Sequence, residues 1–458
     1  MALGGLGVYA CDLGTDPEPV ASTFEVAGEV RRAGGGPVAE AVVVLQKAVT
    51  SVGFDLPPSV SFDVLRRTSS DASGHFAFKL RSFPCNGPSL RVDVHDVAWR
   101  SSAPLSVPCG RDASGTLEVV PGLVSTPSLV ALPEPARAVS AGNRSTCAVG
   151  ESGTLYCWGL QLERPRGAPD EGRIHWLPRV ITTGVSAVNV SGEGSARHAC
   201  LLRDSGEASC WGWNQLGVLG IGTDEDRVTP TDTVAGDLLF TQITVDAATC
   251  GRTEAQEVWC WGGNTEGALG TDPGPEQCTV GILGNLVDLP CSRTPVLVAG
   301  GLAVRTISAV GSQVCALDLL GSPYCWGGAW GLDPQLVAPG LTLDSLDRNC
   351  GATSDGEIVC WGSGPGLPLT YPGGSERYRS LSSQFPVPSA FSTSFCAITL
   401  TAELHCNGQE ANGGLRRLAV GPSEPVTAIS VGANHACALT LSGAVYCWGE
   451  GNRGQLGI

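Results

Sequence analysis

The sequence lacks any apolar stretch that could cross a lipid bilayer, since no run approaches the length of about 18 residues that this requires. It also lacks an excess of positive charge. The net charge is −16, and the region after residue 120 holds 18 basic against 31 acidic residues. Because nucleic-acid affinity depends on lysine and arginine replacing counterions, this region would repel a phosphate backbone. The composition excludes a membrane-spanning chain and argues against DNA or RNA as a partner.

Catalytic motifs are also missing from the sequence. It contains no G-x-S-x-G elbow, no phosphate-binding P-loop and no H-E-x-x-H run, and it has only six histidines. Two of them, His198 and His435, each precede a cysteine by two residues, and this equivalence indicates a structural role. We therefore expect a protein that is not an enzyme and binds no cofactor. A hydrolase whose site no motif reveals stays a rival hypothesis.

Cysteine and glycine are abundant, at 19 and 62 residues. Fourteen of the cysteines form pairs separated by ten residues, and these pairs recur about every 48 residues, a period typical of propeller blades and other stacked units. The repeat predicts one large, all-β domain built from seven similar units. The seven expected pairs are Cys147 with Cys157, Cys200 with Cys210, Cys250 with Cys260, Cys315 with Cys325, Cys350 with Cys360, Cys396 with Cys406, and Cys437 with Cys447.

A turn signal lies between the paired cysteines. Five repeats place glycine six residues after the first cysteine, at Gly153, Gly206, Gly321, Gly356 and Gly443. In the last repeat, strands 437–440 and 444–447 predict a hairpin with a three-residue loop whose glycine is left-handed. Cys437 then faces Cys447 at a non-hydrogen-bonded position, where Cα atoms lie about 4.5 Å apart and a disulfide fits.

Two of the repeats lack this glycine. Gln256 and Ala402 take its place in the third and sixth repeats. Since residues with a side chain avoid the left-handed conformation, we expect these two turns to be built differently.

Tryptophan and glycine follow the second cysteine in six of the seven repeats, and the sixth repeat has Asn407 and Gly408 there instead. A large flat ring beside a residue without a side chain suits the narrow joint between stacked sheets. We expect these rings to serve packing. They are Trp158, Trp211, Trp261, Trp326, Trp361 and Trp448.

The remaining cysteines predict two further disulfides. Cys85 pairs with Cys109 and Cys278 with Cys291, which leaves Cys11 single. Zinc sites favour C-x(2 to 4)-C spacing, and the repeat cysteines have nine intervening residues and no matching histidines, so we expect no metal. Because cytosolic thiols are kept reduced, so many paired cysteines indicate an oxidising compartment and therefore export.

The first 21 residues resemble the end of a bacterial lipoprotein signal. The run MALGGLGVYAC ends at Cys11, where such a signal carries its lipid, although it has no basic segment and its apolar segment is short. A frayed terminus with an incidental thiol stays the alternative. We expect a secreted protein or a bacterial cell-envelope lipoprotein that contacts the membrane only through a lipid on Cys11.

Residues 22–121 form a separate domain of short strands, where alternation such as that at 91–94 marks strands with one buried face. The segments Gly36–Val43 and Asp71–Phe76 resemble the carboxypeptidase regulatory-like, transthyretin-like β-sandwich. That resemblance implies a spacer or adhesive module. We expect Cys85 and Cys109 to staple it.

Residues 122–458 resemble the regulator of chromosome condensation repeat family. The last repeat carries the resemblance through Ile429–Gly432, His435, Cys437–Leu439, Gly443, Val445–Gly449, Asn452 and Gly454–Gly457. The second repeat adds His198, Asn214, Gly217 and the segment 223–230. The resemblance implies a seven-bladed β-propeller. We expect the segment around Pro127 to Leu132 to supply the outer strand that closes the ring, because an open ring would leave bare strand edges.

The resemblance implies a class of function. The founding member of the family is a nucleotide exchange factor that binds chromatin, but an acidic, exported propeller would meet no cytosolic GTPase, so exchange activity is an alternative by family name only. Exported bacterial propellers of this type bind proteins with loops at one rim. We expect a monomeric, non-enzymatic scaffold that binds a protein or a surface glycan. An inhibitor of a secreted enzyme is the second alternative.

Three features are candidates for contact with a partner. The loop 271–293 is pinned by its two cysteines, and Trp213 and Trp330 are expected to be exposed rings outside the Trp-Gly positions. Asp224, Glu225 and Asp226 form an acidic run that lacks the D-x-D-x-D-G pattern of a calcium loop, so it is interpreted as a solvated turn. A tolerated insertion with packed rings stays the alternative reading of the loop and the tryptophans.

Overall fold

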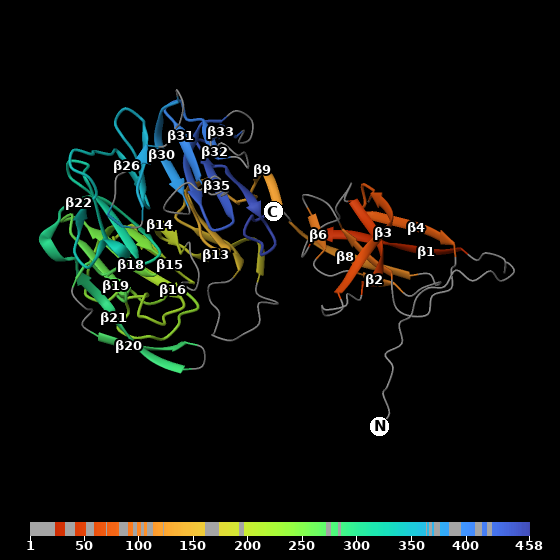
Figure 1. Ribbon diagram of the computed structural model, residues 1–458, viewed down its shortest axis with the longest axis horizontal. Coiled ribbons are helices and arrows are strands. Elements are labelled where there is room, and N and C mark those ends of the chain that lie inside the picture. The colour runs from red at the N-terminus through yellow and green to blue at the C-terminus, as the bar shows by residue number, and fades with distance from the viewer. Residues whose placement is uncertain are drawn as a thin grey trace. The chain divides into compact units, whose positions relative to one another are not determined.

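Two compact units make up the chain, Met1–Val124 and Ser125–Ile458. A computed structural model of the chain, shown in Figure 1, describes residues 23–32, 42–51, 59–69, 71–81, 90–94, 99–101, 105–107, 113–121, 123–160, 174–191, 197–271, 276–282, 285–362, 364–365, 369–370, 376–383, 395–407, 415–418 and 424–458. These residues contain no α-helix, and none of their helical turns is long and apolar enough to cross a membrane.

The first unit is a small β-sandwich. One sheet has the order β4-β1-β8-β6, formed by His75–Arg81, Thr23–Arg32, Ala113–Pro121 and Trp99–Ser101. The other has the order β3-β2-β5-β7, formed by Ser59–Ser69, Val42–Ser51, Leu90–Val94 and Leu105–Val107. Buried side chains include Val26, Val30, Val43, Phe76 and Phe78. Cys11, Cys85 and Cys109 lie outside the described residues.

The Asp71–Phe76 segment begins β4 with a tight turn. The Asp71 carboxylate accepts the backbone N–H groups of Ser73 and His75 at 2.8 and 2.9 Å, and Gly74 is left-handed with φ 79°. These backbone hydrogen bonds lower the pKa of Asp71 below its usual value. The aspartate and the glycine of this motif therefore serve the turn itself.

The second unit is a propeller of seven sheets, numbered here as blades 1 to 7. Blade 1 contains β10 (Ala136–Ala141), β11 (Ser145–Gly150), β12 (Leu155–Leu160) and β13 (Ile174–Thr182), and blade 2 contains β14 (Val185–Val190), β15 (His198–Arg203) and β16 (Ala208–Gly212). Blade 3 contains β17 (Phe240–Val245), β18 (Ala248–Thr253), β19 (Val258–Gly263), β21 (Asn285–Leu297) and β20 (Glu276–Ile282), followed by the 3-10 turn η1 (Ala299–Gly301).

Blade 4 contains β22 (Val304–Val310), β23 (Gln313–Asp318), β24 (Pro323–Gly327) and β25 (Gln335–Leu336), with the 3-10 turn η2 (Gly328–Trp330). Blade 5 contains β26 (Ser345–Asp347), β27 (Cys350–Ala352), β28 (Ile358–Cys360) and β29 (Leu369–Thr370). Blade 6 contains β30 (Tyr378–Ser383), β31 (Phe395–Thr399), β32 (Leu404–Asn407) and β33 (Leu415–Arg417), and blade 7 contains β34 (Val426–Val431), β35 (His435–Thr440), β36 (Val445–Glu450) and β9 (Leu123–Leu129).

A strand from the start of the second unit closes the ring. Figure 1 shows β9 beside the C-terminal end of the chain, and β9 is the outer strand of blade 7, next to β36. The pairing continues past the strand end, where the Val130 N–H donates to the Val445 carbonyl at 2.8 Å. The predicted closure is confirmed, although the strand begins four residues earlier than Pro127.

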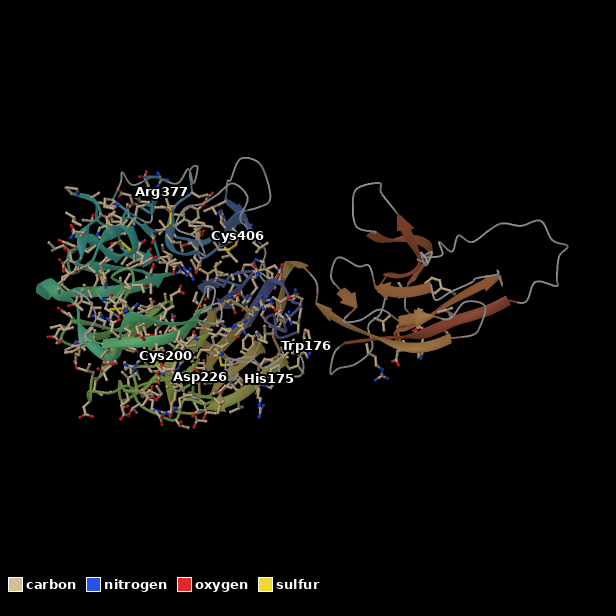
Figure 2. All side chains as sticks on the ribbon, turned by 60° about the horizontal axis from the view of Figure 1, so that its bottom comes forward. His175, Trp176, Cys200, Asp226, Arg377 and Cys406 are labelled. Carbon is tan, nitrogen blue, oxygen red and sulfur yellow. A yellow bond between two sulfur atoms is a disulfide. The ribbon has the colours of Figure 1, made fainter. Side chains whose placement is uncertain are left out.

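Every blade has a disulfide between its second and third strands, and several of these bonds are visible in yellow in Figure 2. The two cysteines of each pair lie directly opposite each other, and the five turn glycines have φ between 79° and 90°. The hairpin register predicted from the spacing of ten is therefore present in all seven blades. The bonds join Cys147 to Cys157, Cys200 to Cys210, Cys250 to Cys260, Cys315 to Cys325, Cys350 to Cys360, Cys396 to Cys406, and Cys437 to Cys447.

The paired strands approach more closely than the spacing alone predicts. The Cα atoms of the seven pairs lie 4.0 to 4.1 Å apart, against about 4.5 Å for an ordinary non-hydrogen-bonded pair. The covalent link between the side chains holds the two backbones together. The Cα–Cα distance is therefore shorter than expected in every blade.

The repeat cysteines are buried in nearly every blade. Every first cysteine is fully buried, as are the second cysteines Cys210, Cys260, Cys325, Cys360 and Cys447. Cys406 is slightly less enclosed, and Cys157 is only half-buried at the margin of its apolar cluster.

The turns at Gln256 and Ala402 are built like the others, so the expectation of a different turn is wrong. Both residues are left-handed, with φ 67° and 64°, and each N–H donates to the carbonyl three residues back at 3.0 Å, as Gly443 does. The disulfide and the strand pairing impose one register on every hairpin. The residue at this position must therefore adopt the left-handed conformation whatever its type, at a cost of about 1 kcal/mol.

The disulfide also lies at the centre of the packing between blades. Five apolar clusters combine the cysteines of one blade with the tryptophan of the next, and these tryptophans are Trp211, Trp261, Trp326, Trp361 and Trp448. The prediction that the Trp-Gly rings serve packing is confirmed. Blade 6, which has asparagine instead, packs Tyr378 and Phe395 on the cysteines of blade 5.

The turn that ends a repeat holds the indole ring of the next blade. Trp158 donates its Nε1–H to the Gln455 carbonyl at 2.9 Å, and Trp261 and Trp326 bond in the same way to Val218 and Ala268. A Cβ added to Gly457 would lie 2.8 Å from Trp158 Nε1, so only glycine permits this close approach. The Gly-x-Leu-Gly segment therefore packs against the neighbouring indole ring and accepts its hydrogen bond.

A closed circle of seven hydrogen bonds joins the innermost strands. In each blade the residue opposite the first cysteine accepts a backbone N–H from the inner strand of the next blade. The acceptors are Ser140, Asn189, Thr244, Ser308, Asp347, Ser382 and Ser430, and the distances are 2.7 to 3.1 Å. Burial raises the pKa of Asp347, the only acid in the circle.

Two buried histidines reinforce the joints. His198 donates from Nε2 to the Thr249 hydroxyl at 2.9 Å, since that hydroxyl donates to the Val218 carbonyl. His435 and Thr146 repeat this arrangement between blades 7 and 1 at 2.6 Å. In both rings Nδ1 has no hydrogen-bond partner. Protonation would therefore place an unpaired N–H donor and a positive charge in the interior, and burial lowers the pKa of each histidine to about 3. The structural role predicted for these two residues is confirmed.

Replacing Ala402 by glycine should stabilise the second unit by roughly 0.5 to 1 kcal/mol, because glycine is not strained at φ 64°. Gly153→Ala is the matched control with the opposite sign. A Cβ at Gly153 meets no atom closer than 3.4 Å, so its loss of stability reports the backbone alone. Urea-induced unfolding measures all three proteins. An Ala402→Gly variant less stable than the parent would contradict the strain argument.

The stability of the fold should fall with acid through the two buried histidines. Their folded pKa of about 3 lies below the unfolded value of 6.5, so the unfolded chain binds more protons between these values. Stability is complete above pH 6.5 and falls below it, by up to about 1.4 kcal/mol per pH unit for each histidine.

The double variant His198→Gln, His435→Gln tests this pH dependence. Gln313 occupies the equivalent place in blade 4, two residues before Cys315, so glutamine suits the site. The free energy of unfolding should fall less between pH 7 and pH 4.5 in the variant than in the parent. An identical fall in both proteins would show that the histidines do not carry the effect.

Candidate interaction surface on blades 2 and 3

The loop after β16 is folded around a buried amide. Asn214 donates from Nδ2 to the carbonyls of Thr223 and Glu225 at 2.8 and 3.1 Å, and its Oδ1 accepts the Leu219 N–H at 2.9 Å. Asn264 plays the same part in blade 3. The asparagine of the repeat therefore fixes the conformation of the loop that carries the acidic run.

The three acidic residues of the run have separate roles. Asp226 accepts the backbone N–H of Asn214 at 2.8 Å. Glu225 pairs with Arg227 at 3.1 Å, and Asp224 lies 3.8 Å from Arg293, with about half of its side chain exposed. The described residues contain no group of three acidic, histidine or cysteine side chains placed to hold a metal ion. The run acts as an anchored turn with two exposed carboxylates.

The two candidate tryptophans differ in exposure. Trp213 is half-buried, and the Arg197 guanidinium lies 5.1 Å from the centre of its ring. Trp330 is only 4% exposed, so the expectation that it lies on the surface is wrong. The turn η2 folds the chain back, and the ring fills the apolar cluster between blades 4 and 5 with Leu343 and Trp361. Trp213 is the one of the pair that stays accessible to a partner.

The expected loop 271–293 is a β-hairpin instead. Strands β20 and β21 pair without any register shift, and β21 joins this hairpin to blade 3 as a fourth and fifth strand. Cys278 bonds to Cys291 diagonally, because Cys278 lies opposite Leu289, and the two Cα atoms are 5.9 Å apart. The alternation of polar and apolar residues over 277–280 was the available sequence signal for a strand, and β21 joins the hairpin to the sheet by pairing with β19.

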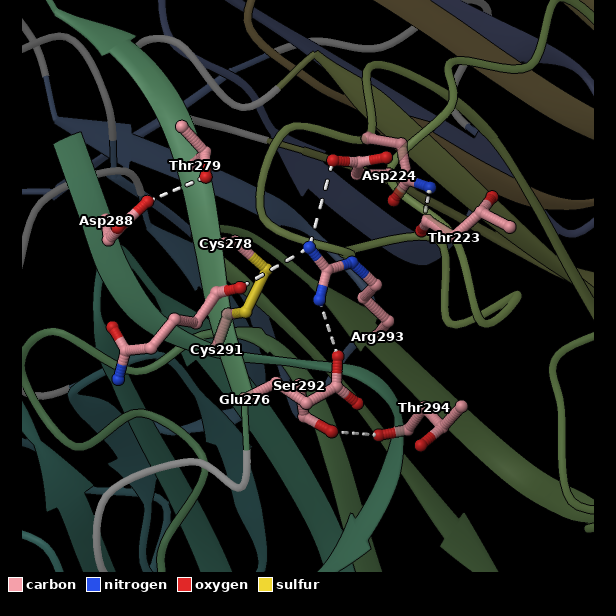
Figure 3. Close-up of a disulfide and its surroundings, with 12 residues drawn as sticks. Thr223, Asp224, Glu276, Cys278, Thr279, Asp288, Cys291, Ser292, Arg293 and Thr294 are labelled. Atoms are coloured by element: carbon pink, nitrogen blue, oxygen red, sulfur yellow. Dashed lines mark hydrogen bonds and ion pairs between the residues drawn. A yellow bond between two sulfur atoms is a disulfide. The ribbon is translucent and has the colours of Figure 1, made fainter. Parts of the chain in front are cut away.

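Arg293 joins the hairpin to the loop of blade 2, as Figure 3 shows. Its guanidinium lies 2.6 Å from the Glu276 carboxylate and 3.8 Å from that of Asp224, while its carbonyl accepts the Gly222 N–H at 2.9 Å. The loop 222–232 and the hairpin 276–293, together with Trp213, thus form one continuous area, called the blade 2–3 surface below. Sequence reasoning did not single out Arg293; its place two residues after Cys291 was the available signal.

The blade 2–3 surface is acidic and carries exposed apolar side chains. Its carboxylates are those of Asp224, Glu225, Asp226, Asp232, Glu276 and Asp288, against the cations Arg227 and Arg293. Val228, Leu286 and Val287 are 54%, 81% and 37% exposed. The area thus combines a net negative charge with exposed apolar side chains on a disulfide-pinned hairpin.

Comparisons with known proteins agree with the repeat. The model of the Regulator of chromosome condensation (RCC1) repeat matches residues 136–161 and 426–455, in the first and last blades. The secretion-regulating guanine nucleotide exchange factor of Mus musculus is 26% identical over 339 residues, which cover 69% of this chain and 64% of that protein. The E3 ubiquitin-protein ligase HERC2 of Mus musculus is 26% identical over 353 residues, covering 68% of this chain and 7% of that protein.

Among solved structures, human WBSCR16 superposes with a TM-score of 0.53 at 15% sequence identity, covering 74% of this chain and 94% of that one. The second unit is therefore an all-β propeller whose first and last blades match the RCC1 repeat model. The chain spans less than two thirds of the length of the curated relatives named above.

Replacing Arg293 by methionine should loosen the blade 2–3 surface while leaving the ring folded. The change removes the ion pairs to Glu276 and Asp224 but keeps the apolar stem of the side chain. Hydrogen exchange measured by mass spectrometry should become at least several-fold faster in both 222–232 and 276–293.

Arg227→Met is the matched control, because Arg227 bonds to Glu225 and Asp232 within the loop alone. It should speed exchange in the loop and leave the hairpin unchanged. Equal effects of the two substitutions on the hairpin would show that Arg293 does not connect the two segments.

Proposed function

We propose that this protein is an exported, non-enzymatic scaffold that binds a partner protein at the blade 2–3 surface. The observation that carries the proposal is the surface itself, in which Arg293 and the Cys278–Cys291 disulfide hold two segments of different blades in one acidic and apolar area. A rigid surface loses little conformational entropy when a partner binds, so its exposed side chains can contribute most of their contact energy.

Export is supported by the eight disulfides among the described residues. Bonds of this kind persist outside the cytosol and are rare within it. A lipid on Cys11 of a bacterial envelope protein would be one form of export, and secretion the other. A carboxypeptidase regulatory-like role for the first unit, as a spacer, fits its two small sheets.

Guanine nucleotide exchange is named for one relative, but a disulfide-bonded, acidic propeller is poorly suited to a cytosolic GTPase. A protein partner is preferred to a surface glycan, because the Arg197 guanidinium lies over one face of the Trp213 ring and leaves less of the ring for a sugar to stack on. Inhibition of a secreted enzyme is the second candidate, favoured by Leu286, which is 81% exposed on the pinned hairpin.

Chemical crosslinking on intact producing cells should identify the partner, and substitutions should then locate the contact. Trp213→Ala and the pair Asp224→Asn, Glu225→Gln should each weaken binding by at least about 2 kcal/mol, or roughly 30-fold, if they belong to a binding hot spot. Isothermal titration calorimetry with the captured partner measures the change.

Glu254→Gln and Asp355→Asn are the matched controls for charge. Both acids are exposed in hairpin turns at the opposite end of the blade strands from the blade 2–3 loop. They should leave the affinity unchanged. An affinity that depends on these two acids and not on Asp224 and Glu225 would move the binding surface to the other end of the propeller.

A further inference from the structure

The outer edges of six blades are protected against pairing with another strand. Blade 1 ends on β13, which contains Pro178 and two register shifts, and blade 7 ends on β9, which contains Pro127. Blade 2 has its outer side covered by isolated bridges to Arg227 and Thr233. The outer strands of blades 4, 5 and 6 have only two, two and three residues. Proline, irregular register and short length are the usual defences of an exposed strand edge.

Blade 3 has none of these defences. Its outermost strand, β20, has seven residues, no proline, lysine or arginine, and seven consecutive pairs with β21 that include no register shift. The disulfide between Cys278 and Cys291 holds this strand in place. Cys278 and Val280 are buried, while Gln277 and Thr279 are exposed, so the strand presents one solvent face and one edge that pairs with no other described strand.

The backbone groups at this edge can be assigned. The Pro290 carbonyl accepts the Asn264 N–H at 2.8 Å, so Pro290 directs its polar group away from β20. Its opposite residue, Gln277, is therefore in a non-hydrogen-bonded pair, and its own N–H and C=O point outward. Because the pattern alternates, the backbone groups of Thr279 and Gly281 also point outward. Arg293 Nη2 donates to the Gln277 carbonyl at 3.4 Å, so the outward groups without a partner among the described residues are the Gln277 N–H and those of Thr279 and Gly281.

The negative charge near this edge favours a positively charged partner segment. Glu276 is the first residue of the strand, and the Thr279 hydroxyl donates to the Asp288 carboxylate at 2.6 Å. Asp224 lies 3.8 Å from Arg293, whose charge is already paired with Glu276. A second copy of β20 would bring the same acids to within about a Debye length and be repelled. An extended segment with lysine or arginine at alternate positions would be attracted, as in strand addition to a sheet edge.

We propose that β20 is a docking edge to which a basic, extended segment of the partner protein adds as a sixth strand of blade 3. This inference rests on the proposed scaffold function, and it names the binding mode and the chemistry of the segment. The partner's backbone bonds to the Gln277 N–H and to the backbone groups of Thr279 and Gly281, and its cations face the nearby carboxylates.

The test uses the full chain and two synthetic ten-residue peptides of alternating pattern, one with four lysines and one with four glutamates at the same places. Fluorescence anisotropy should show binding of the lysine peptide only. Thr279→Pro removes one outward N–H and should weaken that binding at least tenfold. Thr279→Val, which loses the same 2.6 Å bond to Asp288 but keeps the N–H, should bind like the parent.

A second measurement does not depend on the folding of the proline variant. N-methylation of alternate backbone amides in the lysine peptide should abolish binding, and hydrogen exchange on the parent should show protection of 277–281 by the unmodified peptide. Equal binding by the two Thr279 variants, equal binding of both peptides, or undiminished binding of the methylated peptide would overturn the proposal.

Sedimentation of the parent gives the remaining outcome. A dimer that Thr279→Pro converts to a monomer would mean that a second copy of the chain occupies the edge. If the crosslinked partner loses affinity with Trp213→Ala but not with Thr279→Pro, the scaffold function stands and strand addition falls. If neither substitution matters, the blade 2–3 surface is not the binding site.

Discussion

The disulfide between the second and third strands is the constraint on which the rest of the propeller depends. It holds each hairpin in one register, so that Gln256 and Ala402 must adopt a backbone conformation that suits glycine. The same sulfur atoms lie in the apolar layer that receives the tryptophan of the next blade. A single covalent bond thus sets the geometry within a blade and supplies packing surface between blades.

The joints between blades show which parts of the repeat are interchangeable. Blades 7 and 1 meet through His435 and Thr146 and through the hydrogen bond from Trp158 to the Gln455 carbonyl, and these are the repeats that the RCC1 model matches. Between blades 4 and 5, the indole N–H of Trp361 bonds to Cys325 Sγ instead of to a backbone carbonyl. The circle of inner-strand bonds needs only an acceptor, so serine, threonine, asparagine and aspartate all serve.

The blade 2–3 surface is built from additions to the repeat. An added hairpin, a second type of disulfide and Arg293 are all placed on the outer side of blade 3, and none of them is needed to close the ring. Additions that stabilise a surface without contributing to the core are typical of binding loops carried by a rigid scaffold. This is why the proposed function and the proposed docking edge both lie there.

The sequence by itself determined the blade number, the hairpin register, the closing strand and the structural role of the Trp-Gly rings, because these follow from spacing along the chain and from residue size. Trp330 shows where such reasoning ends: its burial depends on the turn η2 and on side chains of blade 5 that spacing does not bring to it. Arg293 and Asp224 are 69 positions apart, and the circle acceptors stand at varying distances from their cysteines. Only the tertiary structure decided these contacts, since a contact between blades depends on how neighbouring sheets pack, and the repeat specifies that packing only on average.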